Sequence, residues 1–228
     1  MKKLELYYPT KPFKITQKFG ENPKLYAQFN IKGHNGLDIL AAHGLPIYAT
    51  HDGIGYYQVD GSQGHGVVVR TNETLDFQGK EVFYKTIYWH FCDYRKEPKF
   101  KPPVPTSGAP FPVKRGDLLG YADNTGFSMG DHLHFGLKPI LPGKPTSDWG
   151  DVTDFGIGDF KNVAQTNGYL GSIDPTFYFN GKFATDPDIL EPEDAVAVLA
   201  ATEQAKGNVK EASILWSIVQ FIKSFLHK

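Results

Sequence analysis

The segment His132-Leu133-His134-Phe135 alternates imidazole and apolar side chains, and it strongly constrains the fold. Residues two apart in a strand point to the same face, so this segment predicts a strand with both imidazoles on one side of a sheet. His34 and Asp38 are four residues apart and also lie on a common side of an extended segment or helical turn. Two imidazoles and one carboxylate, with a further imidazole alongside, are what a catalytic zinc site needs. If the two segments meet, the sequence predicts a metallohydrolase.

Turn-forming and strand-forming residues dominate the first 182 residues. The 24 glycines and 16 prolines exceed the roughly 12% that the two residues make up on average. Tyrosine, phenylalanine, valine and isoleucine favour strands over helices. We therefore predict a mainly β protein with strands near 13–16 and over 44–50, 53–59, 66–71, 81–90 and 118–122, and loops over 72–80, 96–112 and 141–171.

The composition changes after about residue 182. A chain of 228 residues can form one well-buried domain with an appendage. We expect a β-rich domain over 1–182, a linker over 183–192 and a helical tail over 193–228, whose apolar residues have the spacing of an amphipathic helix. Three uses of this tail stay open: packing on its own domain or a neighbouring chain, lying on a membrane surface, and anchoring the protein in a larger particle.

Charge and cysteine content narrow the partners. The net charge of −1 argues against nucleic acid as the main partner. Cys92 is the only cysteine, so no internal disulfide can form. Lys2 and Lys3 are followed by polar and aromatic residues where a signal peptide has an apolar run, and no stretch is long enough to span a membrane. We expect a chain that is not exported by a cleaved signal, or a mature or trimmed one.

The remaining reactive side chains have ordinary explanations. His43, His51 and His65 lie in predicted loops or turns, where solvated side chains are expected. Cys92 follows His90 by two residues, and we expect an ordinary thiol there rather than a metal ligand. Regular alternation puts Tyr88 on the face of His90, where it either donates a hydrogen bond in a cleft or packs.

Three motifs in order resemble those of the lysostaphin-type (LytM-like) zinc endopeptidases that act on peptidoglycan. Gly33-His34-Asn35-Gly36-Leu37-Asp38-Ile39 resembles the first zinc-binding motif of that family. Tyr88-Trp89-His90-Phe91 is similar to its central motif, and the run from Asn124 to Phe135 is similar to its closing motif. The resemblance covers roughly residues 13–182.

The resemblance implies a fold and a set of site residues. The fold would be the duplicated hybrid motif, a two-layer groove floored by antiparallel strands. One catalytic Zn²⁺ would be held by His34, Asp38 and His134, leaving a coordination position open. His90 and His132 would be the catalytic histidines, and the substrate-binding residues would be Asn124, Gly126 and Tyr88.

Three positions depart from the family pattern without removing a ligand. Asp131 stands where the family usually has proline, Met129 replaces a threonine and Phe91 replaces a leucine. We therefore expect zinc-dependent hydrolysis of peptide bonds in peptidoglycan cross-links or stem peptides. The protein would act at the bacterial cell wall as a phage-encoded or virion-associated endolysin, or as a mature secreted chain. The alternative is a non-catalytic peptidoglycan-binding or virion-structural protein whose C-terminal helix binds a membrane or partner, but such relatives typically lose zinc ligands.

Overall fold

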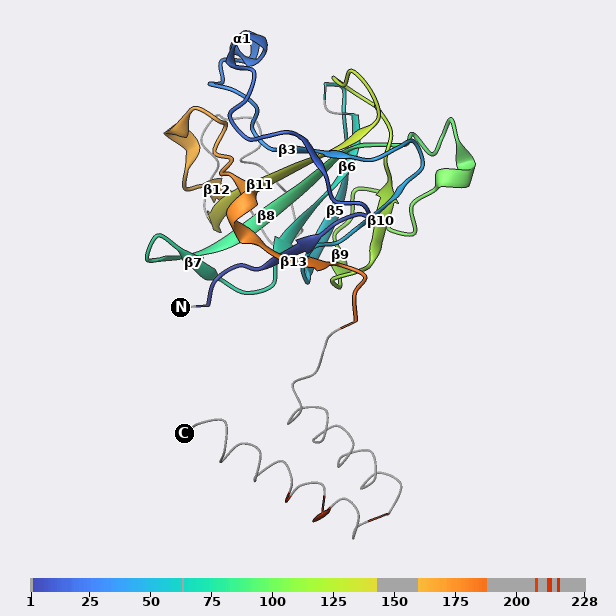
Figure 1. Ribbon diagram of the computed structural model, residues 1–228, viewed down its shortest axis with the longest axis vertical. Coiled ribbons are helices and arrows are strands. Elements are labelled where there is room, and N and C mark those ends of the chain that lie inside the picture. The colour runs from blue at the N-terminus through green and yellow to red at the C-terminus, as the bar shows by residue number, and fades with distance from the viewer. Residues whose placement is uncertain are drawn as a thin grey trace. The chain divides into compact units, whose positions relative to one another are not determined.

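Strands in which buried and less buried residues alternate form a nine-stranded antiparallel sheet in this computed structural model. Figure 1 shows its central strands β11, β8, β6 and β5 side by side. The strand order is β2 (Ile15–Gln17), β3 (Leu37–Leu40), β11 (His132–Pro142), β8 (Lys80–Phe91), β6 (Gly64–Thr71), β5 (Gly53–Asp60) and β9 (Phe111–Val113), with β12 (Phe160–Asn162) beside β11 and β7 (Leu75–Phe77) beside β8.

Two smaller strand pairs and a few short helical turns complete the unit. β1 (Leu6–Tyr8) runs parallel to β13 (Phe179–Phe183), and β4 (Pro46–Tyr48) runs antiparallel to β10 (Leu118–Tyr121). The helical segments are α1 (Pro23–Tyr26), η1 (Ala27–Phe29), η2 (Pro98–Phe100), η3 (Gln165–Asn167) and η4 (Pro175–Tyr178). The prediction of a mainly β, antiparallel fold is confirmed.

The structure describes residues 2–62, 64–142 and 160–187, together with residues 208, 213, 214 and 217. Residues 1–186 form one compact unit, to which the following account refers. The expected linker and helical tail fall almost wholly outside the described residues, so the predicted division at 182 and 192 stays a prediction. Within the described part of the chain, no helix is both long enough and apolar enough to cross a membrane.

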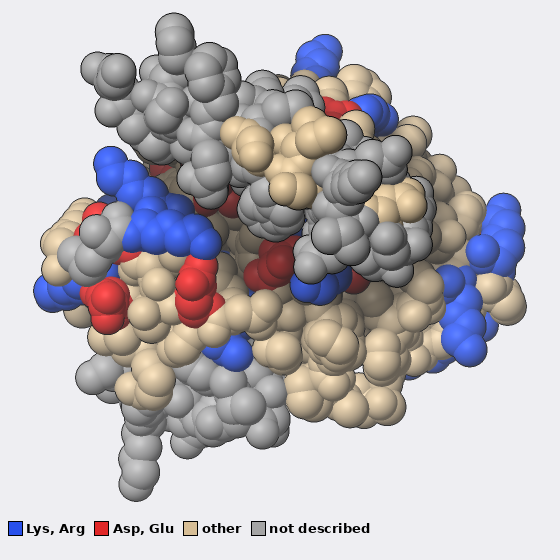
Figure 2. Space-filling model, turned by 90° about the horizontal axis from the view of Figure 1, so that it is seen from below, with Lys and Arg blue, Asp and Glu red and all other residues tan. Residues whose placement is uncertain are grey.

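Strand alternation separates the main sheet into a core face and a groove face. On the core face, Tyr84 and Tyr88 of β8 pack in one cluster with Phe135 and Leu137 of β11. On the groove face, Val68, Ile87 and Trp89 belong to a second, smaller cluster. Among the described residues on the face in Figure 2, acidic and basic side chains lie next to one another at the left, and basic side chains gather at the right edge.

Most predicted strands are confirmed, and the errors concern short strands inside predicted loops. The 72–80 loop contains β7, because Leu75 is buried and its strand pairs with β8 at Val82. The 96–112 loop includes η2 and the start of β9, and the 141–171 loop includes β12. Three-residue strands are held by pairing with a longer neighbour, which local composition does not reveal.

Candidate metal centre

Strand pairing brings together the residues that sequence motifs marked as metal ligands. β3 pairs with β11 so that Asp38 lies directly opposite His134. His34 lies just before β3, and its Nε2 is 3.0 Å from His134 Nδ1. The Asp38 Oδ1 atom is 3.1 Å from His34 Nε2 and 3.3 Å from His134 Nδ1. Three donor atoms from positions 34, 38 and 134 therefore form a nearly equilateral triangle.

The donor triangle fits a zinc ion in size and chemistry. Zinc held by nitrogen and oxygen at about 2.0–2.1 Å in tetrahedral geometry separates its donors by about 3.3–3.4 Å. The observed sides of 3.0, 3.1 and 3.3 Å are slightly shorter, so a small outward movement of each side chain would admit the ion. The three residues form one of two groups in the described chain whose His, Cys, Asp or Glu atoms converge in this way.

His34 is held in the tautomer that a metal ligand needs. Its Nδ1–H donates to the Lys18 carbonyl at 3.3 Å, so in the neutral ring Nε2 carries the lone pair that faces Asp38. The His34 backbone bonds to the chain at Gly20 and Glu21, and the ring of Tyr26 stacks on the imidazole with centroids 5.3 Å apart. His34 is 1% exposed, so its orientation is fixed on all sides.

His132 and His90 lie beside the triangle, each anchored through one nitrogen. His132 Nδ1–H donates to the Gly130 carbonyl at 2.7 Å, and its Nε2 is 3.4 Å from Asp38 Oδ1. His90 Nδ1–H donates to the Thr125 carbonyl at 2.7 Å. The centroid of the His90 ring lies 4.6 Å from that of His132 and 6.0 Å from that of His134. In each neutral ring Nε2 is therefore the nitrogen that can accept a proton.

A β-bulge turns His90 onto the groove face. β8 pairs with β6 so that Trp89 faces Gly66 while Phe91 faces His65, which leaves His90 as the extra residue. Its φ is +69°, in the left-handed region that residues with a Cβ rarely adopt. Because of the bulge, Phe91 packs in the core although Trp89, two residues earlier, lies on the groove face.

The bulge overturns the expectation that Tyr88 shares a face with His90. Tyr88 is fully buried: its ring packs edge-on against Phe135, and its hydroxyl accepts from the Thr50 backbone N–H at 3.0 Å. The substrate-binding role predicted for Tyr88 is therefore replaced by a packing role. Asn124 and Gly126 lie exposed in the loop before β11.

The sequence motifs did not indicate a role for Thr125, which lies between Asn124 and Gly126. Thr125 anchors His90 through its carbonyl, and its hydroxyl donates to the Phe91 carbonyl at 2.7 Å and accepts from the His65 N–H at 3.1 Å. Thr125 thus holds both sides of the bulge. A backbone carbonyl leaves no side-chain signature, so the sequence could not have marked this function.

Burial and contacts among the imidazoles shift the pKa values of the candidate metal ligands and of His90. Burial alone would raise the pKa of the Asp38 carboxyl, but hydrogen bonds with His132, His134 and His34 hold that pKa well below its usual range. Burial lowers the pKa of His134. Burial, with the charges of His134 and His132, lowers the pKa of His90 to about 3. An ionised carboxylate and neutral imidazoles are the forms that bind a metal ion.

Burial opposes protonation of His132, yet the pKa of its ring is raised. The hydrogen bond with Asp38 and the charge of that carboxylate outweigh burial. The two catalytic candidates therefore differ: the pKa of His132 is raised, whereas that of His90 is lowered.

Two of the remaining histidines are not the solvated turn residues that were expected. His51 is buried, with Nδ1–H donating to the Asp52 carbonyl at 2.8 Å and Nε2 accepting from the Thr86 hydroxyl at 2.9 Å. His65 is buried in β6, where its Nδ1 is 2.8 Å from the Tyr57 hydroxyl. Both predictions failed because each imidazole has polar partners that satisfy it inside the fold.

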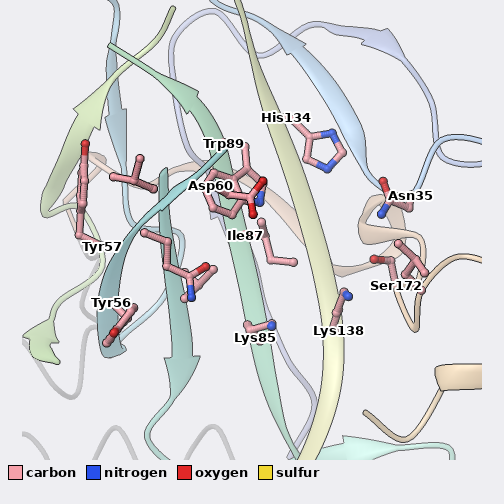
Figure 3. Close-up of a pocket in the computed structure, with 14 residues that line it drawn as sticks. Asn35, Tyr56, Tyr57, Asp60, Lys85, Ile87, Trp89, His134, Lys138 and Ser172 are labelled. Carbon is pink, nitrogen blue, oxygen red and sulfur yellow. The ribbon is translucent and has the colours of Figure 1, made fainter. Parts of the chain in front are cut away.

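A groove of about 470 Å³ extends from His134 across the sheet. Trp89 and Ile87 line it on β8, and Tyr56 lines it on β5. Figure 3 shows His134 and Lys138 on one strand and Lys85 beside Lys138 on the next. These two lysines are direct cross-strand neighbours, and Asp60 also lines the groove, so side chains of both charges lie there.

Comparison with known proteins places this site in a family. The model of peptidase family M23 matches residues 32–146. An uncharacterized metalloprotease of Haemophilus influenzae is 28% identical over 125 residues, which cover 54% of this chain and 22% of that protein. The DD-carboxypeptidase/endopeptidase Mpg of Neisseria meningitidis is 26% identical over 115 residues, covering 50% of this chain and 21% of that protein. The chain thus spans about a fifth of the length of these curated relatives.

Solved structures of peptidases are also similar to this chain. A zinc containing peptidase from Vibrio cholerae is 30% identical, with a TM-score of 0.44 over 60% of this chain and 37% of that one. The catalytic domain of lysostaphin from Staphylococcus simulans is 18% identical, with a TM-score of 0.38 over 77% of this chain and 91% of that one. The family model matches half of the residues of this chain, so the chain belongs to peptidase family M23. The resemblance seen in the motifs is thereby confirmed.

Proposed function

We propose that this M23 peptidase is a zinc-dependent endopeptidase that hydrolyses peptide bonds in bacterial peptidoglycan. The observation that carries the proposal is the convergence of His34 Nε2, Asp38 Oδ1 and His134 Nδ1 within 3.3 Å of one another, with His90 and His132 beside them. A bound zinc ion would supply Lewis acidity, which polarises the scissile carbonyl and makes water more acidic.

The two anchored histidines supply proton transfer and charge stabilisation. His132 Nε2 can accept a proton from the attacking water, because Nδ1–H is occupied by the Gly130 carbonyl. We assign to the same nitrogen the transfer of that proton to the leaving amine. His90 has a lowered pKa and is the weaker base; we assign it to orienting the water and polarising the developing oxyanion.

The groove beside the zinc ligands fits an extended peptide. Trp89 and Ile87 line it and offer apolar contact to a bound peptide. One relative is named a DD-carboxypeptidase/endopeptidase, which supports a substrate containing D-amino acids, as stem peptides do. We assign Asn124 and Gly126, in the exposed loop beside the His90 anchor, to substrate contact.

The site of action and the partners follow from this substrate. We propose that the protein works at the bacterial cell wall, either as a phage-encoded endolysin or virion component or as a secreted chain. In the same proposal the C-terminal segment contacts a membrane surface or a protein partner.

Digestion of purified peptidoglycan tests the proposal. The zinc-loaded protein is incubated with cell walls of several types, and the products are read by mass spectrometry for new amine termini. We expect such termini with the unmodified protein, none with a chelator, and a rate about 10²–10⁴-fold lower with His132→Ala. Absence of new termini despite bound zinc would overturn the proposal and favour a binding or structural role.

A further inference from the structure

A second group of metal-binding side chains lies outside the M23 site. His43, Cys92 and Asp123 place one ligand atom each so that all three atoms lie within 4.8 Å of one another. His43 Nδ1 is 3.0 Å from Asp123 Oδ1. The group combines a nitrogen, a sulfur and a carboxylate oxygen, which is a donor set typical of zinc-class cations.

The fold holds these three side chains together through the backbone. His43 lies between β3 and β4, Cys92 follows β8 and Asp123 follows β10. The Cys92 N–H donates to the Tyr121 carbonyl at 2.8 Å, and the Gly44 N–H donates to the Ala122 carbonyl at 2.8 Å. Each of the three candidate ligand residues therefore lies within one residue of a backbone hydrogen bond. These hydrogen bonds connect the three segments that carry the ligands.

His43 lies between two carboxylates, and this arrangement calls for a cation. Its Nε2 is 3.2 Å from Glu97 Oε2, while Nδ1 faces Asp123 on the other side. A neutral imidazole has one N–H, so if it donates to Glu97 a lone pair faces the Asp123 carboxylate. Either a second proton or a metal ion between Nδ1 and Asp123 removes this repulsion. The pKa of His43 is raised, first by the hydrogen bond with Asp123 and then by that with Glu97.

Cys92 adds a sulfur ligand beside His43 and Asp123, and this favours a metal ion over a proton between them. Its side chain is buried, and Sγ lies within 4.8 Å of the ligand atoms of His43 and Asp123. In the metal-free protein the thiol donates to the Ala122 carbonyl at 3.2 Å. We propose that His43 Nδ1, Cys92 Sγ and the Asp123 carboxylate form a second site for a thiophilic divalent cation of the Zn²⁺ class, with Glu97 accepting from Nε2–H and orienting the ring. The His43 side chain is 38% exposed, so an ion can reach the proposed site from solvent.

Binding balances charge and releases protons. The cation takes the place of the thiol proton of Cys92 and the Nδ1 proton of His43, and a thiolate with a carboxylate neutralises its two charges. Burial raises the pKa of Cys92 to about 12, so the second ion binds more tightly as the pH rises.

An ion bound at the second site would stabilise the backbone segments that carry His90 and His132. The Asp123 N–H donates to the His90 carbonyl at 2.7 Å, and the Asp123 carbonyl accepts from the His132 N–H at 3.2 Å. The second site is therefore a structural one that stabilises the segment from which His90 and His132 project.

Cobalt substitution of the full chain tests the second site. Co²⁺ bound by a thiolate gives a sulfur-to-metal charge-transfer band in the near ultraviolet, whereas nitrogen and oxygen ligands alone do not. We expect two Co²⁺ ions per chain and this band in the unmodified protein. Cys92→Ser should keep one ion and lose the band, and His34→Ala should lose an ion and keep the band.

The unmodified protein alone can overturn the proposal. If excess Co²⁺ at pH 8 gives one ion per chain, or two ions with no thiolate band, the second site does not exist, whatever the variants do. His43→Gln changes an exposed residue and serves as a second test in case the buried Cys92→Ser variant misfolds. It should also bind one Co²⁺ ion per chain. If the unmodified, metal-loaded protein shows the band but hydrolyses no peptidoglycan, the proposed function is refuted and the second site still stands.

Discussion

The Oδ1 atom of Asp38 is the point on which the imidazoles of the M23 site converge. His34, His134 and His132 place a ring nitrogen 3.1, 3.3 and 3.4 Å from this single atom. Such a cluster forms only where the strand register is fixed, because a shift of one residue would turn Asp38 and His134 to opposite faces. At the residue scale, the site therefore depends on atoms that pack the rings in place.

Gly36 is one of these packing residues, and its substitution is the first prediction. A Cβ at position 36 would lie 2.7 Å from His134 Cε1 and 2.7 Å from the Phe135 carbonyl oxygen. Gly36→Ala should displace the His134 ring and lower zinc affinity about 10-fold or more, the loss typical of disturbed ligand orientation. Competition with a chromophoric chelator measures this affinity. Gly61→Ala is the matched control, because nothing lies within 4 Å of its Cβ; equal affinities for the two variants would refute the contact.

Motifs in the sequence indicated the side chains of the site but not the atoms that orient them. His34, Asp38 and His134 carry recognisable spacing, and the structure brings their donor atoms together. The Lys18, Gly130 and Thr125 carbonyls fix the tautomers of the rings, yet any residue type offers a carbonyl. These contacts are consequences of the path of the backbone, which only the fold reveals.

At the element scale, the end of β8 decides which side chains reach the groove. The strand predicted over 81–90 is β8 (Lys80–Phe91), but regular alternation wrongly puts Tyr88 on the same face as His90. The bulge reverses the alternation after Trp89, and no local residue pattern around His90 marks it. Its left-handed backbone is held by tertiary contacts, above all the His90–Thr125 hydrogen bond.

The left-handed conformation of His90 predicts an unusual order of stability. At φ of +69° any side chain with a Cβ is strained, by roughly 1–2 kcal/mol, and glycine is not. His90→Gly should therefore be more stable than His90→Ala by about 1 kcal/mol, the reverse of the order in a regular strand. Urea unfolding of the two metal-free variants measures the difference. Equal stability, or a more stable alanine variant, would mean that the bulge is absent.

Across the whole unit, buried histidines couple the fold to pH. Burial lowers the pKa of His51, which hydrogen-bonds with the Asp52 carbonyl and the Thr86 hydroxyl, and the nearby Asp52 charge only partly offsets burial. The folded state then binds fewer protons than the unfolded state below the ordinary histidine pKa of about 6.5. Stability contributed by neutral His51 is therefore full above about pH 6.5 and declines as the pH falls.

This coupling predicts the effect of a substitution on acid unfolding. The free energy of unfolding should fall below pH 6.5, with a slope that approaches about 1.4 kcal/mol per pH unit for each such proton. His51→Gln should make this decline less steep, even if it lowers stability at neutral pH. Chemical unfolding at a series of pH values gives both slopes; identical slopes would show that His51 titrates normally.

The proposed zinc ligands and catalytic histidines lie within residues 1–186, so we predict that the segment beyond them is dispensable for chemistry. Deletion of residues 193–228 should leave the rate of hydrolysis of soluble peptidoglycan fragments unchanged. Liquid chromatography of the products measures that rate, and digestion of intact cell walls serves as the comparison. A loss of hydrolysis on soluble fragments would assign the tail a part in the peptidase itself.

Zinc titration of the metal-free protein tests the central claim most directly, with hydrolysis of a purified cross-linked peptidoglycan fragment followed at each addition. The account predicts that the unmodified protein becomes active as zinc binds, that Asp131→Asn behaves in the same way, and that Asp38→Asn neither binds this ion tightly nor becomes active. Asp131 is exposed and belongs to no donor group, so its variant controls for loss of charge beside the site. Full hydrolysis by Asp38→Asn, or by the unmodified protein without metal, would contradict the assignment of His34, Asp38 and His134 as the catalytic zinc site.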